Sequence, residues 1–173
     1  METELTEEKE MKDSFDEVLD FGENSGLADL KLTVEGRTIP VIKGLLCMAS
    51  PKLCSILEST TELDLPEKKY DDVVEFLKCI YPNKLKTITD ENVYKVLPLA
   101  SEYQVEKLKR RSEKVLLGKM KQHFMKNALE LYRHIKLAEL YGMDELKQAC
   151  IYAASDLKLP DLKGARSVHS ISS

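Results

Sequence analysis

The stretch from Ala28 to Leu57 constrains the fold more than any other part of the chain. It opens with apolar and polar residues in alternation from Leu30 to Glu35, which is typical of a strand with one buried face. Glu35-Gly36 then supplies a turn, and Thr38–Val41 gives a second short extended run. The pattern therefore predicts a β-hairpin.

A helical pattern follows the hairpin from Lys43 and is interrupted at Ser50-Pro51. Because Ser is a preferred N-cap and Pro suits the first helical position, a second helix is predicted to start there. Its apolar residues are Leu53, Ile56 and Leu57. Hairpin, helix, Ser-Pro break and helix thus follow one another in a single short stretch.

The remainder of the chain is mostly helical. After the brief loop Glu58–Thr60, alternation over Thr61–Pro66 predicts one more short strand. Apolar spacing predicts a helix over Tyr70–Tyr81, and Thr89 is expected to cap the next helix, which contains Pro98.

Three more helices are predicted beyond Pro98. The first, over Val105–Leu116, is basic and has Gly118 as its stop or weak point. Asn127 is expected to cap the second, and Gly142 to break it before a last helix that starts at Asp144.

The helical half contains a repeat. The pattern Leu99-Ala100-x-x-Tyr103-x-Val105-x-x-Leu108-Lys109 recurs 38 residues later as Leu137-Ala138-x-x-Tyr141-x-Met143-x-x-Leu146-Lys147. Two copies are fewer than a solenoid needs. We therefore expect the first helix pair to pack on the sheet-bearing part and the second pair to pack on the first.

Composition places the chain among globular proteins. Of its 173 residues, 43% are hydrophobic and 32% are charged. It has no apolar run near the ~20 residues of a membrane span, and no apolar signal-peptide core. The four cysteines lie in apolar helical patterns without metal-ligand spacing. Free buried thiols in a reducing compartment are expected, and hence a cytoplasmic or nuclear protein.

The N-terminal segment is strongly acidic. Met1–Ser25 holds ten acidic residues against Lys9 and Lys12, and residues 1–10 are expected to be a flexible, solvated start. The apolar residues Phe15, Val18, Leu19 and Phe21 recur at roughly helical spacing, so a helix is predicted over Met11–Asp20. Its apolar stripe covers either a partner subunit or the chain's own core.

The sequence gives little support for a catalytic function. His123, His134 and His169 are isolated, and His134 is expected to be a partly exposed helix residue. No nucleophile elbow, phosphate-cradling glycine loop or zinc-protease motif is present. The sequence therefore predicts neither an enzyme nor a cofactor site.

The order of elements from Ala28 to Leu117 resembles the BTB/POZ domain. The resemblance implies an α+β fold, in which a small mixed sheet is capped by a helical cluster and extended by a C-terminal helical hairpin. It places the BTB/POZ domain at residues 11–118, a helix pair resembling the three-box or BACK region at 119–159, and a flexible tail at 160–173.

The resemblance also implies a homodimer. Asp29 and Lys43 match an acidic and a basic family residue that line a charged pocket at the dimer interface. Phe15 and Leu19, on the leading helix, are assigned to the same interface. Ile42 and Ile39 stand where the family has a histidine and an aromatic residue.

The run Ser50–Glu58 is similar to the Ser-Pro-x-Phe-x-x-Met-Phe-Glu run of BTB proteins that bind cullin-3. These proteins include the speckle-type adaptors, which also carry a MATH domain. This sequence shows no segment that resembles a MATH domain. Ile56 and Glu58 match the positions that engage the cullin. The predicted cullin-binding residues are Leu53, Ile56, Leu57, Glu58 and Tyr103. The implied function is a homodimeric adaptor that recruits a substrate protein for ubiquitination.

Two other functions remain open. The first is a dimerising transcriptional or cytoskeletal BTB scaffold that binds no cullin. The second is nucleic-acid binding through the basic stretch Lys107–Lys126, which lacks interleaved aromatic residues. A solvated helix face, or contact with the acidic N-terminal segment, also explains that basic stretch.

Overall fold

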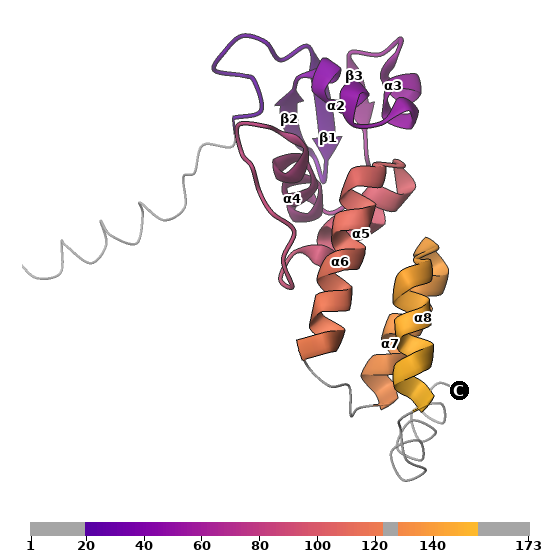
Figure 1. Ribbon diagram of the computed structural model, residues 1–173. Coiled ribbons are helices and arrows are strands. Elements are labelled where there is room, and N and C mark those ends of the chain that lie inside the picture. Colours follow the sequence, from indigo (N-terminus) through magenta and orange to yellow (C-terminus); the bar gives the residue numbers. More distant parts are fainter. Residues whose placement is uncertain (1–19, 123–127, 156–173) are drawn as a thin grey trace, which may run out of the picture.

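The computed structural model describes residues 20–122 and 128–155. The sheet lies at one end of the molecule, α5 and α6 run through its middle, and the pair α7–α8 lies at the other end (Figure 1). The elements are β1 (Leu30–Val34), β2 (Arg37–Val41), α2 (Lys43–Ala49), α3 (Pro51–Leu57), β3 (Glu62–Asp64), α4 (Tyr70–Ile80), α5 (Val93–Glu102), α6 (Glu106–Gln122), α7 (Ala128–Tyr141) and α8 (Asp144–Ser155). The α+β prediction is confirmed. Among the described helices, none is both long and apolar enough to cross a bilayer.

The sheet has three strands in the order β2-β1-β3. β1 pairs antiparallel with β2, with Leu32 opposite Ile39, and parallel with β3, with Leu32 opposite Leu63. At the hairpin turn Glu35 and Gly36 both have positive φ, 51° and 73°, as a two-residue turn matched to the twist of the strands requires. The predicted hairpin and third strand are therefore confirmed, and the sheet is mixed.

The start of α5 differs from the prediction. The helix begins at Val93 with Asn92 as its N-cap residue, not at Thr89. Asn92 is 4% exposed; its Oδ1 accepts the Thr89 N–H at 2.8 Å, and its Nδ2 donates to the Thr87 carbonyl at 3.1 Å. The Asn92 side chain thus bonds the backbone of the loop that precedes α5. Thr89 lies in a turn of that loop and not at the start of the helix.

The end of α6 also differs. The helix continues through Gly118 to Gln122 instead of stopping there. A glycine inside a helix costs about 1 kcal/mol relative to alanine. Its neighbours Leu116 and Met120 are 0% and 8% exposed, and their burial offsets that cost.

The sequence repeat corresponds to a repeated helix–bend–helix. In the first copy the Val105 N–H donates to the Ala100 carbonyl at 2.8 Å, and in the second Met143 donates to Ala138 at the same distance. In each copy the donor follows a residue in the left-handed conformation, and the acceptor carbonyl lies five residues earlier. This hydrogen bond is characteristic of the Schellman motif, which ends many helices. The bend residues Gln104 and Gly142 have φ of 53° and 60°. The two predicted helix hairpins are confirmed.

The second hairpin packs on α6. The carboxylate of Glu113 on α6 accepts the backbone N–H of Leu146, in the first turn of α8, at 3.1 Å. Leu146 and Cys150 are fully buried, and the Cys150 thiol lies 3.6 Å from the Met120 sulfur. The expectation that the second helix pair packs on the first is therefore confirmed. Asn127, the expected cap of α7, lies outside the described residues.

Replacing Glu113 tests this attachment. Glu113→Ala removes the side-chain acceptor from the start of α8, so the free energy of unfolding should fall by about 1 kcal/mol. Urea denaturation measures the change. The control is Glu91→Ala, an exposed residue before α5. Equal stability of the two variants would show that Glu113 does not hold α8.

Candidate interaction surfaces

A buried serine at the junction of α2 and α3 fixes the position of α3. The Ser50 side chain is 0% exposed, and its hydroxyl accepts the N–H groups of Lys52 at 3.0 Å and Leu53 at 3.2 Å. The same hydroxyl donates to the Tyr103 carbonyl at 2.6 Å, at the end of α5. The predicted N-cap is therefore confirmed. It also ties α3 to an element that is remote in the sequence.

The five residues assigned to cullin binding divide into two groups. Leu53, Leu57 and Tyr103 are 4%, 1% and 8% exposed, so their side chains belong to the core. The Tyr103 ring lies 6.0 Å from that of Phe76. Ile56 is 40% exposed, and Glu58 is exposed at the end of α3. Of the five, these two side chains are the exposed ones.

Asp29 and Lys43 lie together, but their side chains form no ion pair with each other among the described residues. Asp29 instead accepts the backbone N–H of Lys43 at 2.7 Å, at the start of α2. The Lys43 ammonium donates to the carbonyls of Glu58 and Thr60 at 3.0 and 3.2 Å. The pair thereby joins β1, α2 and the loop after α3. Phe15 and Leu19, also assigned to the dimer interface, lie outside the described residues.

Tyr81 contacts both the segment that precedes β1 and the residue that precedes α2. Its hydroxyl accepts the Ile42 N–H at 2.7 Å, and its ring packs edge-on against Phe21 at 4.9 Å. Burial raises the pKa of Tyr81 to about 12, although the Ile42 bond acts in the opposite direction. Gly22 passes so close to Ile42 that a Cβ would lie 2.6 Å from its side chain. The entry of the chain into β1 is therefore fixed.

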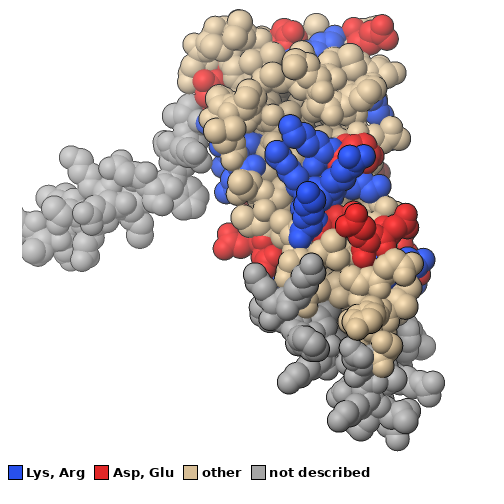
Figure 2. Space-filling view, in the orientation of Figure 1, with Lys and Arg blue, Asp and Glu red and all other residues tan. Residues whose placement is uncertain are grey.

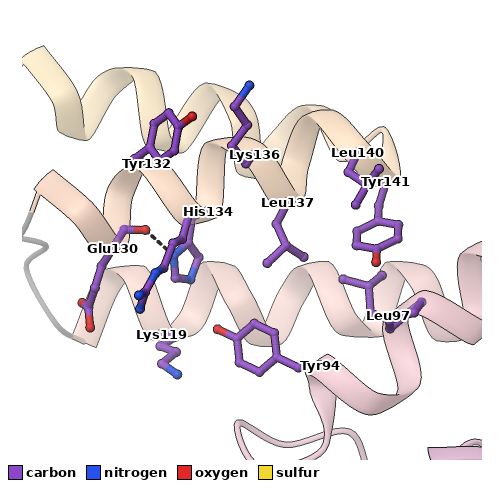
Figure 3. A pocket seen from close by; sticks show the side chains of 12 residues that line it. Tyr94, Leu97, Lys119, Glu130, Tyr132, His134, Lys136, Leu137, Leu140 and Tyr141 are labelled. Carbon is purple, nitrogen blue, oxygen red and sulfur yellow. Dashed lines mark hydrogen bonds between the residues drawn. The ribbon is translucent and has the colours of Figure 1, made fainter. Parts of the chain in front are cut away.

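A hollow of about 590 Å³ lies between α5, α6 and α7 (Figure 3). His134 lines it and is 5% exposed, so the expectation of a partly exposed histidine is wrong. Its Nδ1 lies 2.8 Å from the Glu130 carbonyl, which requires the proton on Nδ1. Nε2 is buried and forms no hydrogen bond with a described residue.

The basic stretch lies along α6. Figure 2 shows Lys and Arg side chains gathered over the middle of the molecule, where α6 lies in Figure 1. The Lys119 ammonium, on this helix, lies 5.5 Å from the centre of the Tyr94 ring on α5. Residues 123–126 of the stretch lie outside the described residues.

Cys79 and Cys150 are unsuited to nucleophilic chemistry. All four cysteines are free; Cys150 is buried and the others are half-buried. Burial raises the pKa of both Cys79 and Cys150 to about 11, whereas a reactive cysteine needs a lowered value. Within residues 20–122 and 128–155, no cluster of three His, Cys, Asp or Glu side chains could hold a metal ion.

A model of the BTB/POZ domain family matches residues 17–120, and the chain belongs to this family. BTB domains are non-enzymatic modules of protein binding and self-association.

One solved structure that is similar is the BTB domain of human gigaxonin. It is 22% identical over 53% of this chain and 82% of its own chain, with a TM-score of 0.43. No curated protein matches the sequence.

Removing the Ser50 hydroxyl tests the junction. In Ser50→Ala the buried Tyr103 carbonyl and the start of α3 both lose their partner, so the free energy of unfolding should fall by about 1–3 kcal/mol. Urea denaturation provides the measurement. Ser55→Ala, an exposed serine of α3, should change it by less than about 0.5 kcal/mol. Comparable losses in both variants would refute the role of Ser50.

Alkaline pH tests the Tyr81 anchor. Because its pKa is raised from 10.0 to about 12, its contribution to stability is complete below pH 10 and is lost as the pH rises to about 12. Thermal melts from neutral pH to pH 12 should therefore show a shallower alkaline decline for Tyr81→Phe than for the wild type. An equal alkaline decline in melting temperature for the two proteins would contradict the attribution of the raised pKa to the burial of Tyr81.

Proposed function

We propose that this chain is a homodimerising BTB adaptor that binds cullin-3 and recruits a substrate protein for ubiquitination. The observation that carries the proposal is the outer edge of α3. Ile56 is 40% exposed there, beside the exposed Glu58, at the positions that resemble the cullin-binding run. Such an adaptor performs no chemistry; it acts by raising the effective concentration of one partner near the other.

The rigidity of α3 supports this assignment. Leu53 and Leu57 hold the inner face of the helix in the core, while Ser50 holds its start. Ile56 is thus presented without an ordering cost, which favours affinity. We assign Leu53, Leu57 and Tyr103 the role of positioning this surface, and Ile56 and Glu58 the role of contacting the cullin.

The helix pair α7–α8 supports a second contact. We assign it to a three-box or BACK-like extension, residues 119–159, that follows a BTB/POZ domain at 11–118; α6 crosses that boundary. The hollow beside it has an apolar floor that includes Leu97 and Leu137. This is the part of the extension that suits an apolar segment of a cullin.

Homodimerisation rests on the surface next to the sheet. Leu27, which precedes β1, and Met48, on α2, are apolar side chains that are 63% and 86% exposed, and packing against a second copy would remove this apolar area from water. We propose that a second copy covers this surface, and that Asp29 and Lys43 set its shape by fixing the start of α2 and the end of α3.

A dimerising scaffold that binds no cullin is the second candidate. It is favoured by the loop between α3 and β3, which is short and held by Lys43 through the carbonyls of Glu58 and Thr60. A partner therefore has little to contact beyond the end of α3.

Capture of the chain by the N-terminal domain of cullin-3 separates these candidates. Ile56→Asp places a charge in the proposed contact and should weaken binding at least tenfold, or by about 1.4 kcal/mol. Glu58→Ala should weaken it several-fold. The control Leu85→Asp alters an exposed leucine after α4 and should bind normally. Equal capture of all variants would refute the α3 site, and no capture of the wild type would favour the scaffold.

Sedimentation tests the dimer independently of the cullin. The wild-type chain should sediment as a dimer at tens of micromolar, and Met48→Asp should shift it toward monomer because a charge would enter the apolar interface. A wild-type monomer at that concentration would contradict homodimerisation.

A further inference from the structure

The hollow between α5, α6 and α7 contains a polar atom that no described residue satisfies. His134 lines this hollow and is 5% exposed, and its Nδ1 is bonded to the Glu130 carbonyl. Its Nε2 is buried and has no hydrogen-bond partner among the described residues. In a neutral imidazole that carries its proton on Nδ1, the other nitrogen is an acceptor. A buried acceptor without a donor costs free energy, so a ligand that brings the donor gains affinity here.

The surroundings of His134 suit an aromatic ring as the carrier of that donor. Figure 3 shows His134 and Leu137 pointing from α7 toward Tyr94 and Leu97 on α5. Leu97 is 0% exposed and Leu137 is half-buried, so the floor of the hollow is apolar. The rings of Tyr94 and Tyr141 line it as well. Aromatic side chains pack favourably against both kinds of surface, and those of tyrosine and tryptophan also carry a donor.

Two further features favour a protein segment as the occupant. Pro98 has no backbone N–H, so the carbonyl of Tyr94, one turn earlier in α5, lacks its helical donor, and both residues line the hollow. The backbone of a bound segment has N–H groups to offer. The charged residues of the lining are three basic ones and one acidic one, namely Lys119, Arg133, Lys136 and Glu130. This balance favours an acidic residue beside the aromatic one.

We propose that the hollow takes a tyrosine or tryptophan side chain of a partner protein. The O–H or N–H group of that side chain donates to Nε2 of His134, and its ring packs between Leu97 and Leu137. His134 thereby selects among segments, because a phenylalanine or leucine at the same place leaves Nε2 unpaired. The inference deepens the second contact proposed for α7–α8, and it rests on that proposal only in taking a protein segment as the occupant.

Model compounds for single side chains test the anchor. p-Cresol, 3-methylindole and toluene reproduce the side chains of tyrosine, tryptophan and phenylalanine, and NMR titration of the ¹⁵N-labelled full-length chain gives their affinities. We expect the first two to bind about three- to tenfold more tightly than toluene, as one hydrogen bond to a buried acceptor predicts. The shifted amide signals should include those of Leu97, Leu137 and Tyr141. Equal affinities for p-cresol and toluene, or no shift at these residues, would overturn the proposal.

Substitutions at His134 assign this preference to Nε2. His134→Phe keeps an aromatic ring without an acceptor, so the affinity for p-cresol should fall to that for toluene. His134→Gln offers an amide oxygen in place of Nε2 and should keep part of the preference. The control Arg133→Gln, at an exposed neighbouring position, should keep all of it. Thermal melts establish that each variant is folded. A preference for p-cresol that survives in folded His134→Phe would refute the role of His134.

A pair of peptides tests whether the occupant is a protein segment. The acetylated and amidated peptide Asp-Leu-Tyr-Leu-Asp should bind more tightly than p-cresol, and more tightly than the same peptide with phenylalanine in place of tyrosine. Binding of the tyrosine peptide that is no tighter than that of p-cresol would assign the hollow to a small molecule and overturn the proposal.

These titrations fail or succeed separately from the capture experiment with cullin-3. Capture of the cullin domain by a chain that does not distinguish p-cresol from toluene would overturn the assignment of the hollow and leave the adaptor proposal standing. Discrimination between the two compounds by a chain that captures no cullin would support the hollow as a site for a segment of another partner and refute the adaptor proposal.

Discussion

One buried hydroxyl connects the part of the fold that is local in sequence to the part that is not. Ser50 ends α2, caps α3 and donates to the carbonyl of Tyr103, which lies at the bend between α5 and α6. A buried hydroxyl needs its hydrogen bonds, so this group stabilises only the arrangement in which all three elements meet. The outer edge of α3 and the position of α6 are therefore set by the same contact.

Successive attachments extend from this point along the molecule. α6 starts at the bend beside Tyr103, and its Glu113 accepts the first-turn N–H of Leu146 in α8. Toward the sheet, Lys43 holds the loop after α3, while Asp29 holds the start of α2. The surfaces proposed for a cullin and for a second copy are thus exposed edges of one connected core.

The features that could be predicted from the sequence are those with local causes. The hairpin follows from alternation and a turn dipeptide, the α3 start from Ser50-Pro51, and the helix hairpins from a repeat whose bend closes on its own backbone. The family followed from the order of these elements, and the family match at residues 17–120 confirms it.

The features that could not be predicted depend on contacts between distant residues. The N-cap residue of α5 is Asn92 and not Thr89, and the Asn92 side chain donates to Glu75 on α4, a contact with a distant residue. His134 is buried because its helix faces α5 and α6, which no pattern within α7 indicates. Leu53, Leu57 and Tyr103 were assigned with Ile56 and Glu58 as one surface. Helical spacing alone did not show which side of α3 the core would take.

The central claim is that the exposed edge of a fixed α3 is the surface that meets a cullin. Amide hydrogen exchange of the full-length chain, with and without the N-terminal domain of cullin-3, tests it most directly. The account predicts that added cullin slows exchange over residues 51–60, while residues 82–92 exchange at an unchanged rate. Protection confined to other elements, or no protection by a cullin domain that is folded and in excess, would contradict it.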